Sequence, residues 1–493
     1  MSAVPAAGVG GGRVPPGPLR ACRRWPRTND EVGPQRFKVA GPGGRSHPGQ
    51  EIEREGNVSV PQPADIAHLL RRAGFGGSAT EIATLASQDW ATTVDQLLNF
   101  AAAAPDTEPA FLTADLGDWE KEFKLQAWWL DRMTTSNVPL QEKLTLFWHG
   151  HFATANSKVF EARLMYQQNA LFRSMATGGF RDLVQQMAVQ PAMLAWLDNG
   201  TNAQGNPNEN FARELMELFT LGVDHYTQAD VVASARAWTG HNTLDRDRTQ
   251  YQFYPDRHDY GTKTFMGVTQ DWDGPDIVNF ILRDDPTHKA IAAKFIATKM
   301  WEYFAYPTPD VDIVAALTSA FLSSDLSIAE LVRTIFNHPA FVSPAAKQGL
   351  VRTPVEWVVA CMRAVGMTAA HANPQWWMAD MGQQLFEPPN VAGWRSNAYW
   401  LTTSRLWARA NWTRYIIWQD HVGDTLNGIV NMTVVDAVQH AFDVMGVDRP
   451  SNHTRAQLEA WLTAQRADRE AWTNWSFINL LTLVMMSPEV NLA

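Results

Sequence analysis

The segment from Pro207 to Gly222 reads PNENFARELMELFTLG. A proline at its start, apolar residues at helical spacing and a closing glycine predict one amphipathic helix. At about 100° per residue, Glu214 falls between Leu218 and Leu221 on the apolar face, with Glu217 beside it. A carboxylate in that position is costly unless it is paired, protonated or bound to a metal. The segment therefore predicts a helix that carries a largely buried ionisable site.

Helical spacing continues on both sides of this segment. Amphipathic runs occur at residues 119–135, 158–177, 227–239, 287–304, 310–323, 343–366, 401–420, 430–444 and 455–486. The exception is residues 249–267, where apolar and polar residues alternate around a polar turn, which is typical of an antiparallel hairpin. No strand–helix alternation appears, so a doubly wound sheet is not expected. We predict a mainly α fold, a large multi-helix domain with a small antiparallel β-hairpin near 249–267.

Residues 1–60 differ in composition from the rest of the chain. They are rich in Gly, Pro and Arg and lack hydrophobic periodicity, so they could not bury enough surface to offset the entropy of ordering. We predict either a disordered tail or an extension from a wrongly assigned start codon, followed by a single α-helical domain over residues 61–493. Arg23-Arg24 is not followed by the apolar stretch of an export signal, which favours a cytoplasmic location.

The composition excludes several classes of protein. A formal net charge of -10 argues against a nucleic-acid-binding protein, which needs a basic face. No run reaches the about 18 apolar residues of a membrane span. Cys22 and Cys361 are the only cysteines, so neither a disulfide framework nor a thiolate metal site is expected. The 21 Trp residues indicate either a Trp-filled core or a groove whose rings stack on a sugar or another flat ligand.

Two histidines, His149 and His151, flank Gly150. On a continuous helix their side chains would point about 200° apart and could not share an ion. Glycine makes that continuity less favourable, and in a turn the rings could converge. Together with Glu214 they form a nitrogen-and-oxygen set suited to Zn, Mn or Fe. We therefore predict His149, His151 and Glu214 as metal ligands; the alternative is that the histidines cap helices or form hydrogen bonds in the core.

Three further residues are predicted to take part in catalysis. Glu217 or Asp259 would act as the general base, and His258 as the acid or as a further metal ligand. The competing, structural interpretation of this acidic stripe is that Glu214 forms an internal ion pair with an arginine, for instance Arg163, Arg173 or Arg236.

Six blocks of sequence resemble a bacterial family catalogued as domain of unknown function 1800. In chain order they are His68–Gly76, Phe147–Thr154, Pro207–Gly222, His258–Phe265, Phe386–Val391 and Gly393-Trp394. The resemblance implies that these blocks belong to one domain, and it implies no particular reaction. Gly150 stands where the family's His-Asn-His pattern has asparagine. Members commonly carry an export signal, so the resemblance implies an exported form in place of a cytoplasmic one.

The activity we predict is metal-assisted hydrolysis of a glycan or another cell-envelope polymer, which would be the ligand of the protein. A first alternative is a non-enzymatic binding or assembly protein whose Trp-rich groove holds a carbohydrate or a partner. A second alternative is an iron-dependent oxidoreductase that uses the same ligands. The three differ in whether the predicted site binds a metal and what the metal does.

Overall fold

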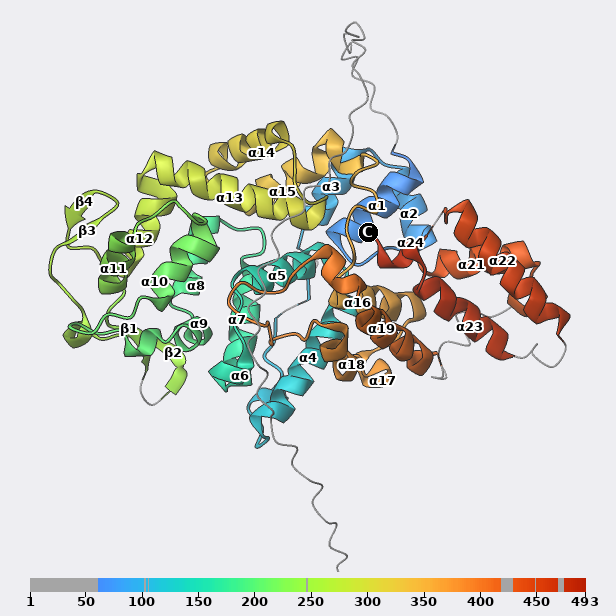
Figure 1. The fold of residues 1–493 in the computed structure, drawn as a ribbon, viewed down its shortest axis with the longest axis horizontal. Coiled ribbons are helices and arrows are strands. Elements are labelled where there is room, and N and C mark those ends of the chain that lie inside the picture. The colour runs from blue at the N-terminus through green and yellow to red at the C-terminus, as the bar shows by residue number, and fades with distance from the viewer. Residues whose placement is uncertain are drawn as a thin grey trace, which may run out of the picture. The chain divides into compact units, whose positions relative to one another are not determined.

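The computed structural model describes residues 61–493 except 102, 105, 245–246, 418–428, 448 and 469–473. Helices make up most of this part of the chain, and each of its two sheets has two strands (Figure 1). The predicted mainly α fold is confirmed. No helix among the described residues is long and apolar enough to cross a membrane. Residues 1–60 lie outside the described residues, so the tail or extension, and the domain boundary after it, stay predictions.

The helices follow one another with short connections. The first group is α1 (Pro63–Ala73), α2 (Ala79–Ala86), α3 (Trp90–Leu98), α4 (Asp118–Thr135), α5 (Pro139–His151), α6 (Asn156–Val159), α7 (Ala162–Ser174), α8 (Phe180–Ala188) and α9 (Pro191–Trp196). The middle group is α10 (Asn210–Glu214), α11 (Gln228–Ala237), α12 (Gly274–Asn279), α13 (Pro286–Phe304), α14 (Val311–Ser323) and α15 (Ile328–Asn337). The last group is α16 (Pro354–Val365), α17 (Ala369–Ala372), α18 (Gln375–Met381), α19 (Thr403–Ile416), α21 (Val434–Val444), α22 (Asn452–Ala467), α23 (Asn474–Met485) and α24 (Pro488–Asn491).

Local sequence explains where several helices begin. The side chain of Asp273 caps α12, and Asp276 returns the bond to the Asp273 backbone, which forms a complete capping box with proline in the first turn. Ser78 accepts a bond from the backbone of Glu81 at the start of α2. Ser327 does the same for α15. These caps fix helix starts that the sequence predicted.

Two large clusters of buried apolar side chains form the core of the described residues. The first draws on α8 and α10–α15, and the second on α4, α7, α16, α18, α19 and α21–α23. Helix α5 contributes to both, since Leu144 and Trp148 belong to the first cluster and Leu146 to the second. In Figure 1, α5 lies between the green and yellow helices and the orange ones. The end of α5, where His149 and His151 stand, is therefore a place where the two halves of the core meet.

The strands pair differently from the predicted hairpin. Strand β1 (His241–Leu244) pairs with β2 (Asp247–Phe253), and β3 (Lys263–Phe265) pairs with β4 (Val268–Gln270), both antiparallel. Residues 249–253 and 263–267, expected to pair with each other, thus each find a nearer partner. The register places His241 opposite Phe253. Closing two short loops costs less chain entropy than closing one long loop, which favours this arrangement.

The segment after Pro207 is helical, but not uniformly α-helical. Helix α10 continues into a π-helical segment, η3 (Leu215–Thr220), in which the Leu221 amide donates to the Met216 carbonyl at 2.8 Å. The Thr220 hydroxyl donates to the Leu215 carbonyl at 2.6 Å, which occupies a carbonyl of the wider turn. A π-helical turn holds more residues than an α-turn, so the faces assigned on α-helical spacing shift after Glu214.

Candidate metal centre

Helix α5 runs without a break through Gly150 to His151. The Phe152 amide donates to the Trp148 carbonyl at 2.8 Å, so the helical pattern continues past the glycine. The expectation that Gly150 would interrupt the helix is therefore wrong, because glycine permits a break but does not impose one. On a continuous helix, His149 and His151 face opposite sides and do not converge.

His149 contacts the second core cluster. Its ring lies 5.2 Å from that of Trp129 and 5.4 Å from that of Trp394, measured between centroids. The backbone N–H of Phe386 donates to His149 Nε2 at 3.1 Å, so this nitrogen is unprotonated. Burial lowers the pKa of His149 to about 3, which keeps the ring neutral. His149 thus supports the loop at Phe386, whose φ of 63° is unusual for a residue with a side chain.

His151 faces the first cluster and a lysine. Its Nε2 lies 3.1 Å from the Phe219 carbonyl, and its Nδ1 lies 3.2 Å from Lys299 Nζ. Burial and the neighbouring Lys299 charge hold the pKa of His151 well below its ordinary value. A cationic amine in contact with the only free ring nitrogen opposes binding of a metal cation there. The predicted ligand set His149, His151 and Glu214 is not brought together.

Glu214 is half-buried, not largely buried as predicted. Burial and then the nearby charge of Glu217 raise its pKa. The three arginines considered as its partners bind other carboxylates, Arg163 with Glu108, Arg173 with Glu142 and Arg236 with Asp259. The interpretation of Glu214 as half of an internal ion pair with one of them is therefore wrong. Glu217 accepts a hydrogen bond from the Tyr226 hydroxyl.

Asp259 forms a two-point ion pair with Arg236, at 2.7 and 3.1 Å. The hydrogen bond from Arg236 is the main reason that the pKa of Asp259 lies below its ordinary value, although burial acts against it. A carboxylate stabilised in this way is a weak proton acceptor. The predicted role of Asp259 as a general base therefore gains no support from its surroundings.

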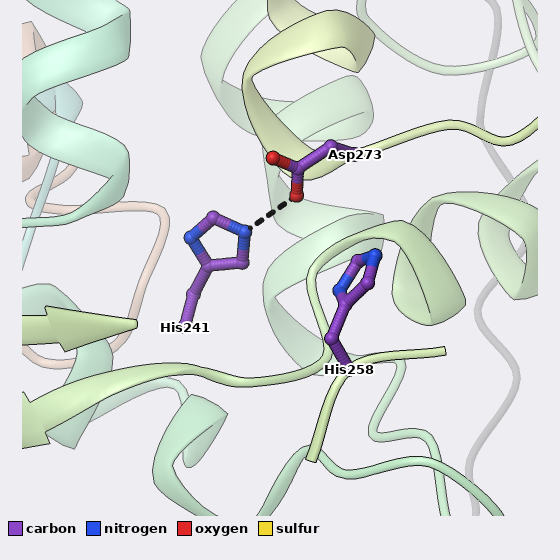
Figure 2. Close-up of side chains that lie close together, drawn as sticks. All are labelled: His241, His258 and Asp273. Carbon is purple, nitrogen blue, oxygen red and sulfur yellow. Dashed lines mark hydrogen bonds and ion pairs between the residues drawn. The ribbon is translucent and has the colours of Figure 1, made fainter. Parts of the chain in front are cut away.

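His258, in contrast, lies in a cluster with two residues that the sequence did not single out, His241 and Asp273 (Figure 2). Each of the three offers one ligand atom, and these atoms lie within 4.8 Å of one another. His241 Nε2 lies 2.8 Å from Asp273 Oδ1, and Figure 2 shows this contact as a dashed line with His258 beside it. Within the described ranges, this is the one group of three such side chains close enough to hold a metal ion.

The hairpin and the loops around it hold the two histidines. His241 begins β1, and its backbone carbonyl accepts a bond from the Asn199 side chain at 2.7 Å. His258 Nδ1 lies 2.8 Å from the Thr239 carbonyl. Gly240 joins the two parts: its φ is +82°, and a Cβ at this position would lie 2.6 Å from the Tyr254 carbonyl oxygen and 3.3 Å from His258 Cβ. Only glycine lets the chain approach so closely.

The three side chains fit a divalent transition metal. Because the Thr239 carbonyl can only accept a hydrogen bond, His258 Nδ1 carries the proton and Nε2 keeps its lone pair, an arrangement common around ligating histidines. Burial acts to raise the pKa of Asp273, but the hydrogen bond and charge of His241 outweigh it and keep the pKa below its ordinary value. Asp273 is therefore a carboxylate at neutral pH. Ligand atoms on a tetrahedral ion lie about 3.4 Å apart, so binding would require the set to contract.

One side of the cluster is open to solvent. The side chain of His241 is 2% exposed, whereas that of Asp273 is 46% exposed. Two nitrogen ligands in the protein and one carboxylate at the surface leave room for a substrate on the Asp273 side. Two histidines with one carboxylate is a ligand set found around Zn and around non-haem Fe.

Sequence reasoning missed His241 and Asp273 for identifiable reasons. Asp273 was interpreted as the start of a helix, which it is, since the same carboxylate caps α12. His241 precedes the stretch recognised as strand. The available signal was Gly240-His241, a glycine and a histidine just before a hairpin whose far end leads to His258.

Comparison with known proteins identifies the chain at the level of a family. No curated protein and no solved structure matches it. The model of a family described as "Protein of unknown function (DUF1800)" matches residues 68–492, which is most of the chain and includes all six blocks noted in the sequence as well as His241 and Asp273. The chain therefore belongs to the DUF1800 family.

Proposed function

We propose that this protein is a metal-dependent hydrolase whose metal ion is held by His241, His258 and Asp273. The observation that carries the proposal is the approach of these ligand atoms to within 4.8 Å, with the charged carboxylate at the open side. His258 thus takes the role of ligand, which was one of the two roles considered for it. Zn, Mn and Fe all suit two nitrogens and one oxygen.

The metal would act as a Lewis acid on an oxygen of the substrate bond. The residues around it have supporting roles. The Tyr251 hydroxyl lies 2.8 Å from His241 Nδ1 and orients the ring. The ring of Tyr260 lies 4.7 Å from that of His258 and is 57% exposed, so it can cover or contact a substrate. Glu217 stays our proposed base, and Glu214, with its raised pKa, an acid near it.

A glycan substrate is supported by a second surface. Trp119, Phe123 and Trp376 form a row of rings, with centroids 5.6 Å apart between the first two and 4.4 Å between the last two. Beside it, a cavity of about 420 Å³ is lined by aromatic and polar side chains, namely Asn373, Trp376, Trp377, Asp380 and Tyr415. Exposed rings beside an amide and a carboxylate are suited to sugar rings and their hydroxyls. We call these residues and the row the aromatic platform.

The same platform supports the non-enzymatic alternative, a protein that binds a carbohydrate without cleaving it. Trp376 is 58% exposed and Trp119 66% exposed, which is unusual for such large apolar rings. Oligosaccharide binding that is lost in Trp376→Ala but kept in Trp407→Ala would support a binding role for the platform. Trp407 is a suitable control because it is 66% exposed and does not line the cavity.

The hydrolase proposal is tested by activity that depends on a metal. The protein is treated with a chelator, supplied with Zn, Mn or Fe(II), and assayed on purified cell-wall polymer and on chromogenic glycosides and esters. We expect hydrolysis with one of these metals, lost in His258→Ala and retained in His225→Ala, which removes an exposed histidine outside the cluster. Metal-dependent hydrolysis that survives in His258→Ala would place the activity elsewhere.

A further inference from the structure

A second cavity lies away from the His241–His258–Asp273 cluster. Its volume is about 230 Å³, and it is bordered by the end of α5, by α13 and by the loop before α19. Its lining includes His151 and Gly150 from one family block and Trp394 from another. It also includes Lys299, whose amine the proposed metal chemistry does not use. A cavity of this size admits a small organic molecule.

Lys299 has unusual surroundings for a lysine. Its Nζ lies 3.2 Å from His151 Nδ1 and 3.4 Å from the Leu218 carbonyl. The ring of Phe295 lies beneath it, at 4.7 Å from Nζ to the centroid. Among the described residues, no carboxylate forms an ion pair with it. The ammonium form is therefore stabilised by dipoles and a ring face only, at a position largely removed from water.

The neighbouring histidine is fixed as an acceptor. The Phe219 carbonyl can only accept, so His151 Nε2 carries the ring proton and Nδ1 presents its lone pair to Lys299. The charged groups that border the cavity are Glu302, one turn along α13, and Arg395 from the loop. Burial lowers the pKa of Lys299 to about 8, and the attraction of Glu302 offsets only part of this effect. A substantial fraction of the amine is then neutral near pH 8.

We propose that the Lys299 amine is the nucleophile of a second site, which binds a small aldehyde or ketone and holds it as an imine. A neutral amine in a partly desolvated cavity is the form that adds to a carbonyl group. Anion binding suits the site less well, because a lysine that gives up its proton easily is a poor partner for an anion.

The reaction is balanced by the release of one water molecule. The nitrogen lone pair of neutral Lys299 forms a bond to the carbonyl carbon, and the carbonyl oxygen takes up a proton to give a carbinolamine. The nitrogen loses its proton, for which His151 Nδ1 is the adjacent acceptor. The carbon–oxygen bond then breaks, the oxygen leaves as water, and the nitrogen and carbon share a double bond. No oxidant or reductant is consumed.

Trapping the imine tests this proposal on the whole protein. Propanal and sodium cyanoborohydride are added at pH 7, the protein is digested with a protease that does not cleave at lysine, and modified peptides are quantified by mass spectrometry. The matched control is Lys294, an exposed lysine on the same helix. We expect Lys299 to be modified faster than Lys294 by on the order of tenfold or more, because far more of its amine is neutral at this pH. Its modification rate should rise with a midpoint near pH 8.

Two variants and one opposite result complete the test. Lys299→Arg keeps the positive charge but has no amine, so the fast modification should vanish, whereas Lys294→Arg should leave it unchanged. The comparison within the wild-type protein stands even if Lys299→Arg does not fold. Modification that follows exposure, with Lys294 faster than Lys299, or a Lys299 rate that rises only near pH 10.5, the ordinary lysine value, would overturn the proposal.

Discussion

His241 and Asp273 are 32 residues apart in the chain, yet His241 Nε2 lies 2.8 Å from Asp273 Oδ1. The carboxylate accepts the Nε2 proton, and His241 Nδ1 then accepts the Tyr251 hydroxyl proton at 2.8 Å. Both nitrogens of a neutral ring are thus satisfied. A metal ion bound by Nε2 would displace one proton, so metal affinity should fall as the pH is lowered.

Replacing Asp273 by asparagine separates its two roles. Asparagine caps a helix as well as aspartate does, so α12 should keep its cap while the negative charge is lost. Because the folded-state pKa of Asp273 lies below 3.8, the charge stabilises the fold above that pH, and this contribution is lost as the pH falls through the folded-state pKa. We expect Asp273→Asn to melt at a lower temperature than wild type at pH 7 and the difference to shrink near pH 3. An equal difference at both pH values would contradict this account.

Gly393 makes a close contact with α5. It has a φ of +77°, and a Cβ there would lie 2.3 Å from the Gly150 carbonyl oxygen. Gly267 has a similar φ of +83° with nothing within 4 Å, so it is a matched control for the backbone effect alone. We expect Gly267→Ala to cost about 1–2 kcal/mol of unfolding free energy and Gly393→Ala roughly 2–5 kcal/mol. Equal costs in denaturant unfolding would show that the loop relaxes away from α5.

Glu142 should matter more to stability than any surface carboxylate. It is buried in α5 and accepts bonds from Arg132 and Arg173 at 2.7 Å and from the Trp129 ring at 2.9 Å. Glu142→Gln leaves two guanidinium groups without their shared anion, which should cost about 3–5 kcal/mol. Glu120→Gln, which breaks only the exposed pair with Lys124, should cost at most about 1 kcal/mol. Chemical denaturation of the two variants measures the difference.

Glu214→Gln tests whether that carboxylate is under electrostatic strain. Its pKa is raised by burial and by Glu217, so the folded protein loses stability relative to the unfolded chain as the pH rises above 4.5, the ordinary value. We expect the variant to melt at the same or a higher temperature than wild type at pH 7 and to show no gain near pH 4. A variant much less stable at pH 7 would mean that the carboxylate has a stabilising partner in solution.

Features set by neighbouring residues could be predicted from the sequence. The caps at Ser78, Ser327 and Asp273 depend on residues three positions away, and the mainly α fold follows from periodicity. The centre could not be predicted, because the contact between His241 and Asp273 depends on how β1 pairs and where α12 begins. His149 and His151 were placed together because glycine allows a break, and the surrounding core does not use that freedom. His258 was singled out correctly as a candidate, but its partners were not.

Metal content tests the central claim most directly. The protein is purified without added chelator, dialysed against Zn, Mn or Fe(II) at pH 7.5, and its bound metal is measured by inductively coupled plasma mass spectrometry. We predict about one ion per chain in wild type and in the exposed-histidine control His225→Ala, and almost none in His241→Ala or Asp273→Asn. The same metal content in all four proteins, whether one ion or none, would contradict a centre formed by His241, His258 and Asp273.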